Sequence, residues 1–127
     1  MQRLPSVYFA PSEIEGRGVF TYDDIPKGTL IEVCPVIIIP KEQVEIIHKT
    51  CLHDYYFLWG EEQDQAAIAL GFGSLYNHSF EPNAEYLVDY SQNTFDFLAI
   101  RDIEAGEEIM VNYNGDNDSR KQLWFHK

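Results

Sequence analysis

Residues 77–86 hold the densest group of chemically useful side chains in the chain. The segment reads Asn-His-Ser-Phe-Glu-Pro-Asn-Ala-Glu-Tyr, and apolar residues stand on both sides of it. A surface loop does not need apolar flanks, and a buried strand does not tolerate Pro82 followed by Asn83. Polar groups set among apolar ones must find hydrogen-bond partners. We therefore expect a site here, in which His78 is either a base or a hydrogen-bonded core histidine.

Two other positions have residue types that suit a binding site. Gly16 and Gly18 flank a single residue, and glycines let a backbone approach a ligand closely, although an ordinary turn entering a strand would use them equally well. The pair lacks the third glycine of a dinucleotide-binding fingerprint. Tyr113 closes an apolar strand at residues 108–112, where a tyrosine is more often a half-buried packing residue than a catalyst.

Metal binding and nucleophilic catalysis find little support in the sequence. His48 and Cys51 would share one face of a helix, but His53 would not, and a fourth ligand is not evident. We therefore expect no metal. Hydrolase chemistry is also disfavoured, because no serine or cysteine stands in a recognisable nucleophile elbow.

Composition limits the partners. The 127 residues predict a single domain, and the formal net charge of −12 disfavours direct binding to nucleic acid. The same charge would attract a basic protein or peptide, although solubility alone also explains an acidic surface. No apolar run approaches the roughly 20 residues that cross a membrane. Without a visible secretory signal or a disulfide framework, we expect an intracellular protein, cytoplasmic or, in a eukaryote, nuclear.

The elements that must position the polar segments are mainly strands. Residues 18–33 and 97–111 repeat a pattern of an apolar strand, Asp-Ile-x-x-Gly and a second apolar strand. In each turn glycine relaxes φ and aspartate can hydrogen-bond backbone. Residues 85–90 and 94–100 predict a hairpin. Together these patterns indicate a compact β core built from two similar halves.

One helix is predicted between the two repeats, around residues 41–59. Pro40 suits the first turn, and Gly60 is a suitable stop. Apolar residues recur at helical spacing on one face, at Val44, Ile47, Cys51, Tyr55 and Leu58. An acidic loop at residues 61–65 follows this predicted helix.

Taken in order, three segments resemble the SET domain of protein lysine methyltransferases. Residues 14–20 are similar to its opening Gly-x-Gly segment, residues 76–83 to its Asn-His-Ser/Cys-x-x-Pro-Asn motif, and residues 103–113 to its Gly-Glu-Glu-Leu…Tyr motif. The three motifs in this order are far more specific than any one alone. The resemblance implies a mainly β SET domain of small β-clip-type sheets, with a C-terminal pseudoknot that joins the central and final motifs. Residues 6–113 would be its core, 41–70 a variable insert with the helix, and 114–127 a short tail.

The resemblance also implies an activity, namely transfer of a methyl group from S-adenosylmethionine to a lysine of a basic protein such as a histone. Tyr113 would line the transfer site next to donor and lysine, and Tyr86 would form part of the lysine channel. The implied donor contacts come from Ile14, Glu15, Gly16, Arg17, Gly18, Asn77 and His78.

The chain departs from the family's pattern in several places. The tail has no cysteine-rich, zinc-binding segment, so we expect Trp124 to cover the donor and Phe125 to complete the lysine channel instead. Residues 33–35 (Val-Cys-Pro) stand where many members have a tyrosine, and Ser74 stands where many have a basic residue. In the variable insert, contacts to basic substrate residues are expected from Glu61, Glu62 and Asp64.

Two alternatives to a protein methyltransferase stay open. A SET-like fold without catalysis would bind lysine-containing peptides or protein partners, and an active one would also be able to methylate a small amine. The presence of Asn77, His78 and Tyr113 favours an enzyme. A homodimer, in which a partner subunit completes the site, is also left open.

Overall fold

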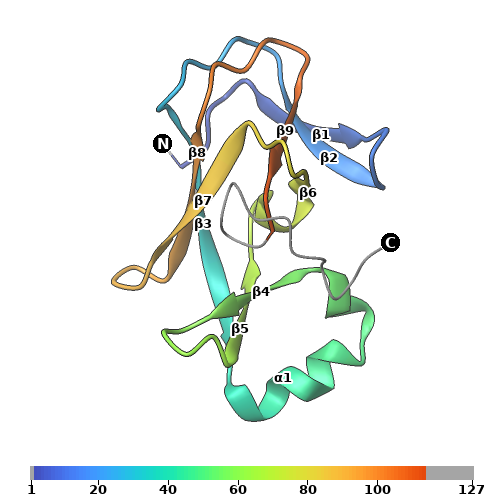
Figure 1. The fold of residues 1–127 in the computed structure, drawn as a ribbon, viewed down its shortest axis with the longest axis vertical. Coiled ribbons are helices and arrows are strands. Elements are labelled where there is room, and N and C mark those ends of the chain that lie inside the picture. Colours follow the sequence, from blue (N-terminus) through green and yellow to red (C-terminus); the bar gives the residue numbers. More distant parts are fainter. Residues whose placement is uncertain (1, 114–127) are drawn as a thin grey trace.

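The computed structural model describes residues 2–113, which form two small β-sheets (Figure 1). The first sheet has the order β1 (Val7–Pro11), β2 (Arg17–Thr21), β9 (Glu108–Val111) and β6 (Asn77–His78). The second has the order β4 (Tyr56–Trp59), β5 (Gln65–Ala69), β3 (Leu30–Ile39), β8 (Thr94–Ala99) and β7 (Ala84–Asp89). The mainly β architecture predicted from the sequence is confirmed.

The helix is much shorter than the sequence predicted. Helix α1 spans Lys41–His48 and is followed by the 3-10 turn η1 (Cys51–Asp54), so the prediction of a helix over residues 41–59 is wrong beyond His48. Thr50 separates the two, because its backbone is extended (φ −112°, ψ 178°) and its Oγ1 accepts the Leu52 N–H at 3.2 Å. No residue of α1 is buried, so the apolar positions predicted at helical spacing do not form one packed face.

The aromatic run after η1 forms a strand instead of a helix. Strand β4 pairs antiparallel with β5, from Tyr56 opposite Ile68 to Trp59 opposite Gln65. Aromatic residues pack well on a pleated, half-buried surface, and pairing with β5 outweighs their helical spacing. In Figure 1, α1, β4 and β5 lie at the end of the molecule farthest from the β1–β2 hairpin.

The turns of the two sequence repeats are joined by hydrogen bonds. Ile25 and Ile103 exchange backbone hydrogen bonds, both at 2.8 Å. Asp24 and Asp102 each accept a backbone N–H from the turn of the other repeat, at 2.8 Å in both cases. The expected bonds between aspartate and turn backbone are therefore present, but they join the two turns to each other.

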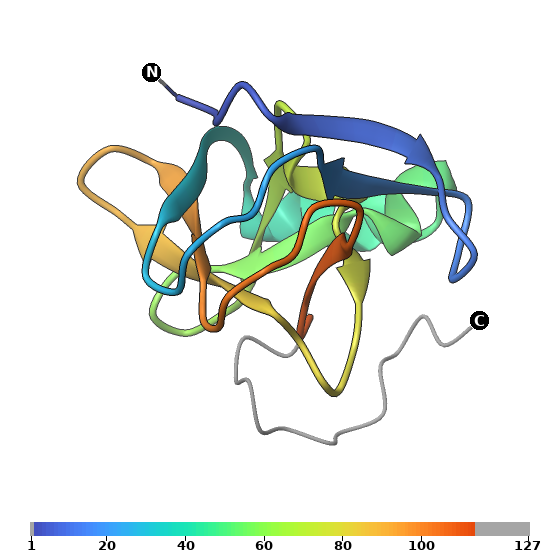
Figure 2. The same cartoon turned by 90° about the horizontal axis from the view of Figure 1, so that it is seen from above.

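The predicted hairpin at residues 85–100 is confirmed as β7 and β8, which pair from Ala84 opposite Ala99 to Asp89 opposite Thr94. Figures 1 and 2 show this hairpin and the β1–β2 hairpin pointing to opposite sides of the molecule. Strands from both sheets supply the buried core, with Val19, Ile31, Phe95, Phe97, Ile109 and Val111 among its members. A further 3-10 turn, η2 (Gly73–Leu75), leads into β6. Within residues 2–113, no helix is long and apolar enough to cross a bilayer.

Candidate active site

A short parallel pairing brings the distant polar motifs together. Strand β6 lies beside β9, with Asn77 opposite Met110 and His78 opposite Val111. The Ser79 N–H donates to the Val111 carbonyl at 3.0 Å and extends the contact. As a result Asn77 and His78 lie next to the end of β9, where Tyr113 follows.

Asn77 ties this junction to the glycine-containing turn that precedes β2. Its side-chain nitrogen Nδ2 donates to the carbonyls of Glu15 at 3.1 Å and Arg17 at 3.2 Å, and to Glu108 Oε2 at 2.8 Å. A Cβ at position 18 would collide with the same Glu108 carboxylate, so Gly18 is required by close approach. The Asn77 nitrogen therefore holds the turn, while Oδ1 is the side-chain atom suited to accept from a ligand.

The turn itself presents backbone next to Asn77. Ser12 Oγ accepts the Ile14 N–H at 3.0 Å and donates to Glu108 Oε1 at 2.7 Å, so Glu108 braces both ends of the turn. Gly16 has a φ of +47°, which favours glycine, and the space around it is open. The Ile14 side chain points away from the core and is exposed. The structure thus places the predicted donor segment, residues 14–18, beside Asn77.

His78 is held as a neutral ring. Its Nδ1 accepts the Tyr113 N–H at 3.0 Å, which assigns the ring proton to Nε2. Burial lowers the pKa of His78 below its ordinary 6.5, since a charged ring is poorly solvated there. Nε2 is buried and has no hydrogen-bond partner within the described part of the chain. A buried donor without a partner is costly, so this N–H is well suited to a ligand acceptor.

Tyr113 and Tyr86 meet at the same place. The Tyr113 hydroxyl donates to the Tyr76 carbonyl at 2.5 Å, and the Tyr86 hydroxyl donates to the Tyr113 carbonyl at 3.0 Å. Burial raises the pKa of both phenols, so both remain protonated donors at neutral pH. Each hydroxyl is thus oriented by a backbone carbonyl.

Phe57 packs against the two tyrosines and Phe95, and the sequence analysis did not predict it as a site residue. These four rings are called the aromatic wall below. The ring centroid of Phe57 lies 5.1 Å from that of Tyr86, 4.9 Å from Phe95 and 6.1 Å from Tyr113. Its side chain reaches this wall because β4 is a strand, whereas the sequence prediction put it in a helix. The signal that could have identified it is the run of aromatic residues at 55–59, which favours a strand.

Other predicted site residues lie elsewhere. Glu61, Glu62 and Asp64 stand in the turn between β4 and β5, where Asp64 faces Lys41 at 3.7 Å in a largely solvated ion pair. Arg17 reaches Asn77 only through its backbone carbonyl, because its side chain is exposed and its guanidinium lies 5.9 Å from the Phe9 ring centroid. The predictions for Trp124 and Phe125 fall outside the described residues.

The histidines of the insert have local partners. His48 Nδ1 lies 2.8 Å from the Tyr56 hydroxyl, and His53 Nδ1 lies 2.9 Å from Asp54 Oδ1. Among residues 2–113, no group of three or more His, Cys, Asp or Glu side chains is arranged to hold a metal ion.

Comparison with known proteins decides the family. The model of the SET domain matches residues 16–114, most of the chain. The chain belongs to the SET-domain family. A fission-yeast protein (Schizosaccharomyces pombe), the histone-lysine N-methyltransferase specific for H3 lysine-37, is 36% identical over 115 residues, which cover 90% of this chain and 73% of the relative.

The fold gives the same result. A crystal structure from Plasmodium falciparum, of a protein assigned as a histone methyltransferase, matches with a TM-score of 0.68 and 31% identity over 89% of this chain and 95% of that one. SET proteins of this kind use S-adenosylmethionine in general. The chain is an S-adenosylmethionine-dependent protein-lysine N-methyltransferase.

Proposed function

We propose that this enzyme methylates a lysine in a histone tail or in another strongly basic protein segment. The observation that carries the proposal is the meeting of Asn77, His78 and Tyr113 at one junction, although 35 residues separate His78 from Tyr113. The histone named for the yeast relative, together with the net charge of −12, supports a basic substrate. A histone substrate would place the protein inside the cell, in the nucleus of a eukaryote.

The donor side of the site is assigned to the backbone of residues 14–18 with Asn77 and His78. Two features fit this assignment: the open space around Gly16 and the buried Nε2–H of His78, which has no partner among residues 2–113. Asn77 Oδ1 can accept from the donor's ammonium group, and His78 Nε2–H can donate to an acceptor on the donor. S-adenosylmethionine supplies a methyl group activated by a sulfonium. Trp124 remains a proposed cover for it.

The lysine side is assigned to Tyr86, Tyr113 and the aromatic wall. A lysine must be neutral to attack, and its ordinary pKa of about 10.4 must fall. An apolar, aromatic channel disfavours the charged ammonium and so lowers that pKa. The raised pKa of Tyr113 keeps its hydroxyl protonated, which makes Tyr113 a positioning group and not the base. Phe125 remains a proposed part of the same channel.

Transfer then depends on alignment. The Tyr113 hydroxyl and the Tyr76 carbonyl form a hydrogen-bonded edge that orients the amine. Because the reaction is a direct displacement, such positioning and the local electrostatics carry the catalysis, and no covalent enzyme intermediate is required.

The deciding experiment is transfer of radiolabelled methyl from S-adenosylmethionine to a panel of basic proteins, with wild type and Tyr113→Phe compared. We expect label on at least one basic protein and a strong loss in the variant. Tyr90→Phe is the matched control, because it removes a phenol hydroxyl from a half-exposed residue of the β7–β8 hairpin. Donor binding without label transfer to any basic protein would contradict the proposed substrate class, and full activity of Tyr113→Phe would contradict its role.

The acidic turn is proposed to bind basic residues that flank the target lysine. Replacing Glu61 and Glu62 with Gln and Asp64 with Asn should weaken peptide binding and flatten its salt dependence, while donor binding stays unchanged. Peptide affinity can be measured by calorimetry at several salt concentrations. Unchanged affinity would remove these residues from the substrate groove.

A further inference from the structure

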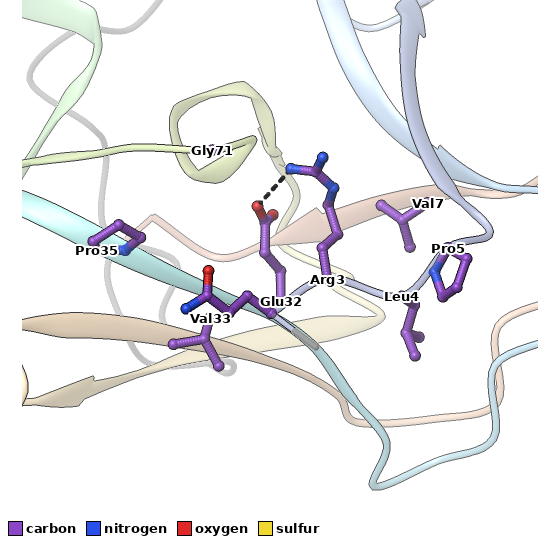
Figure 3. A pocket seen from close by; sticks show the side chains of 9 residues that line it. Arg3, Leu4, Pro5, Val7, Glu32, Val33, Pro35 and Gly71 are labelled. Atoms are coloured by element: carbon purple, nitrogen blue, oxygen red, sulfur yellow. Dashed lines mark hydrogen bonds and ion pairs between the residues drawn. The ribbon is translucent and has the colours of Figure 1, made fainter.

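A buried carboxylate lies behind the proposed transfer site, separated from Tyr113 by Tyr76. Glu32, in β3, is 2% exposed. Its Oε1 accepts the Tyr76 hydroxyl at 2.8 Å, and its Oε2 accepts the Phe72 N–H at 3.0 Å and Arg3 at 3.2 Å. Figure 3 shows Arg3 and Glu32 approaching each other from separate segments, under the turn at Gly71.

The surrounding chain is shaped to hold this carboxylate. Gly71 has a φ of +63°, and a Cβ there would collide with Glu32 Oε2. Arg3 also stacks over Phe72, with its guanidinium carbon 3.8 Å from the ring centroid. Arg3, Glu32 and Gly71 also line a pocket of about 490 Å³, whose other lining residues are Gln2, Leu4, Pro5, Val7, Val33 and Pro35. Removing a carboxylate from water is costly, and apolar residues in place of such a group are often neutral or stabilising, so stability alone does not explain why a glutamate stands at position 32.

Glu32 connects to the transfer site through Tyr76. The Tyr76 side chain is fully buried and stacks on Phe97, with ring centroids 4.2 Å apart and an interplanar angle of 16°. The stack fixes the plane of the ring and Glu32 fixes its hydroxyl. The carbonyl of the same residue accepts the Tyr113 hydroxyl. One residue is thus bonded at its side chain by Glu32 and at its backbone by Tyr113.

We propose that Glu32 is a positioning residue for methyl transfer, which acts by holding Tyr76 so that the Tyr76 carbonyl fixes the Tyr113 hydroxyl. The proposal rests on the proposed role of Tyr113. Glu32 touches neither donor nor lysine in this scheme. Its loss should therefore lower the rate of transfer and leave the binding of both substrates nearly unchanged.

The test is steady-state kinetics of the full chain with Tyr76→Phe, which removes only the hydroxyl that Glu32 accepts. We expect kcat to fall on the order of tenfold or more, with KM for donor and basic protein changed less than about twofold. Arg3→Met breaks the outer contact of Glu32 but keeps the bond to Tyr76. It should lower thermal stability while leaving kcat much closer to wild type. Tyr90→Phe again serves as the matched hydroxyl control.

Coupling shows whether the effect passes through Glu32. Glu32→Leu should lower kcat as Tyr76→Phe does. Because both substitutions break the same hydrogen bond, the variant that combines them should be no slower than the slower of the two single variants. If the losses of kcat in the two single variants multiply in the double variant, the proposal is overturned. A wild-type kcat in folded Tyr76→Phe would also overturn it. This second test stays valid if Glu32→Leu does not fold. A wild-type kcat in Tyr113→Phe would instead overturn the role of Tyr113 itself. If Tyr113→Phe loses kcat while Tyr76→Phe and Glu32→Leu keep the wild-type value, only the inference on Glu32 is overturned.

Discussion

At the scale of single residues, the site depends on the hydrogen bonds of Glu108 and on the space that its carboxylate occupies. Glu108 accepts from both Ser12 and Asn77, and Gly18 leaves room for its carboxylate. Two donors from distant parts of the chain, Ser12 and Asn77, therefore share one carboxylate. Glu108 therefore helps to hold the glycine-containing turn next to Asn77, beside the direct bonds from Asn77 to the carbonyls of Glu15 and Arg17.

The substitution Gly18→Ala tests this arrangement. The new methyl group would push Glu108 away from Asn77 and remove a hydrogen bond to a charged group, worth about 1.5–3 kcal/mol. We expect donor affinity, measured by calorimetry, to fall roughly tenfold or more, since about 1.4 kcal/mol corresponds to a factor of ten. In a Glu108→Ala background the same substitution should cost far less. Equal losses in the two backgrounds would contradict the explanation.

His78 predicts a pH dependence of stability. The fold favours the neutral ring, because burial lowers the pKa of His78, whereas the unfolded chain takes up a proton at the ordinary value of 6.5. The unfolded state then binds more protons, so the free energy of unfolding falls as the pH drops below about 6.5 and is fully retained above it. Urea unfolding at several pH values should show a shallower fall in His78→Gln. An identical pH dependence in wild type and variant would rule out this role for His78.

At the scale of elements, β4 supplies part of the aromatic wall from within residues 41–70, the segment that the sequence predicted as a variable insert. Phe57 is directed inward by β4, and its neighbour Leu58 faces solvent, with 39% of its surface exposed. Alternation along one strand thus separates a site residue from a surface residue. Through Phe57, residues 41–70 would form part of the proposed lysine channel as well as the surface around it.

Substitutions at these two neighbouring positions should behave differently. Phe57→Ala is expected to lower the free energy of unfolding by about 3–5 kcal/mol, the usual result of removing a buried phenyl ring. Phe57→Leu should fold and reduce kcat/KM for the protein substrate with little change in donor affinity. Leu58→Ala, the control, should change unfolding and kinetics only slightly. Wild-type kinetics in Phe57→Leu would exclude Phe57 from the channel.

At the scale of the whole molecule, the net charge of −12 surrounds a site proposed for a cationic substrate. A field of this sign raises the rate at which basic segments meet the surface, and dissolved salt weakens it. The proposed donor side would instead rely on close hydrogen bonds to Asn77, His78 and backbone. These contacts should respond less to salt.

The corresponding measurement is kcat/KM at increasing ionic strength for two peptides with the same target lysine, one rich in flanking basic residues and one with neutral flanks. We expect a fall of about tenfold or more for the basic peptide between low and high salt, and a small change for the neutral one. Equal salt dependence of the two peptides would show that the molecule's charge does not guide substrate binding.

Much of the fold followed from local patterns. Short apolar strands, the Asp-Ile-x-x-Gly turns and the β7–β8 hairpin depend on residues close in sequence, and their prediction was correct. The helix prediction failed beyond His48 because helical spacing and strand alternation both fit a short aromatic run. Pairing with β5 decided between them.

The sequence by itself determined the order and identity of the motif residues, and with them the family and the class of reaction. Only the tertiary structure decided how those residues are paired: the three acceptors of Asn77, the bond from Tyr113 to the Tyr76 carbonyl, and the burial of Glu32. Residue types and spacing fix what chemistry a side chain can perform. Which partner it meets depends on strand register and on contacts between residues 30 to 60 positions apart, such as Tyr76 with Glu32 and Asn77 with Arg17, which no local pattern specifies.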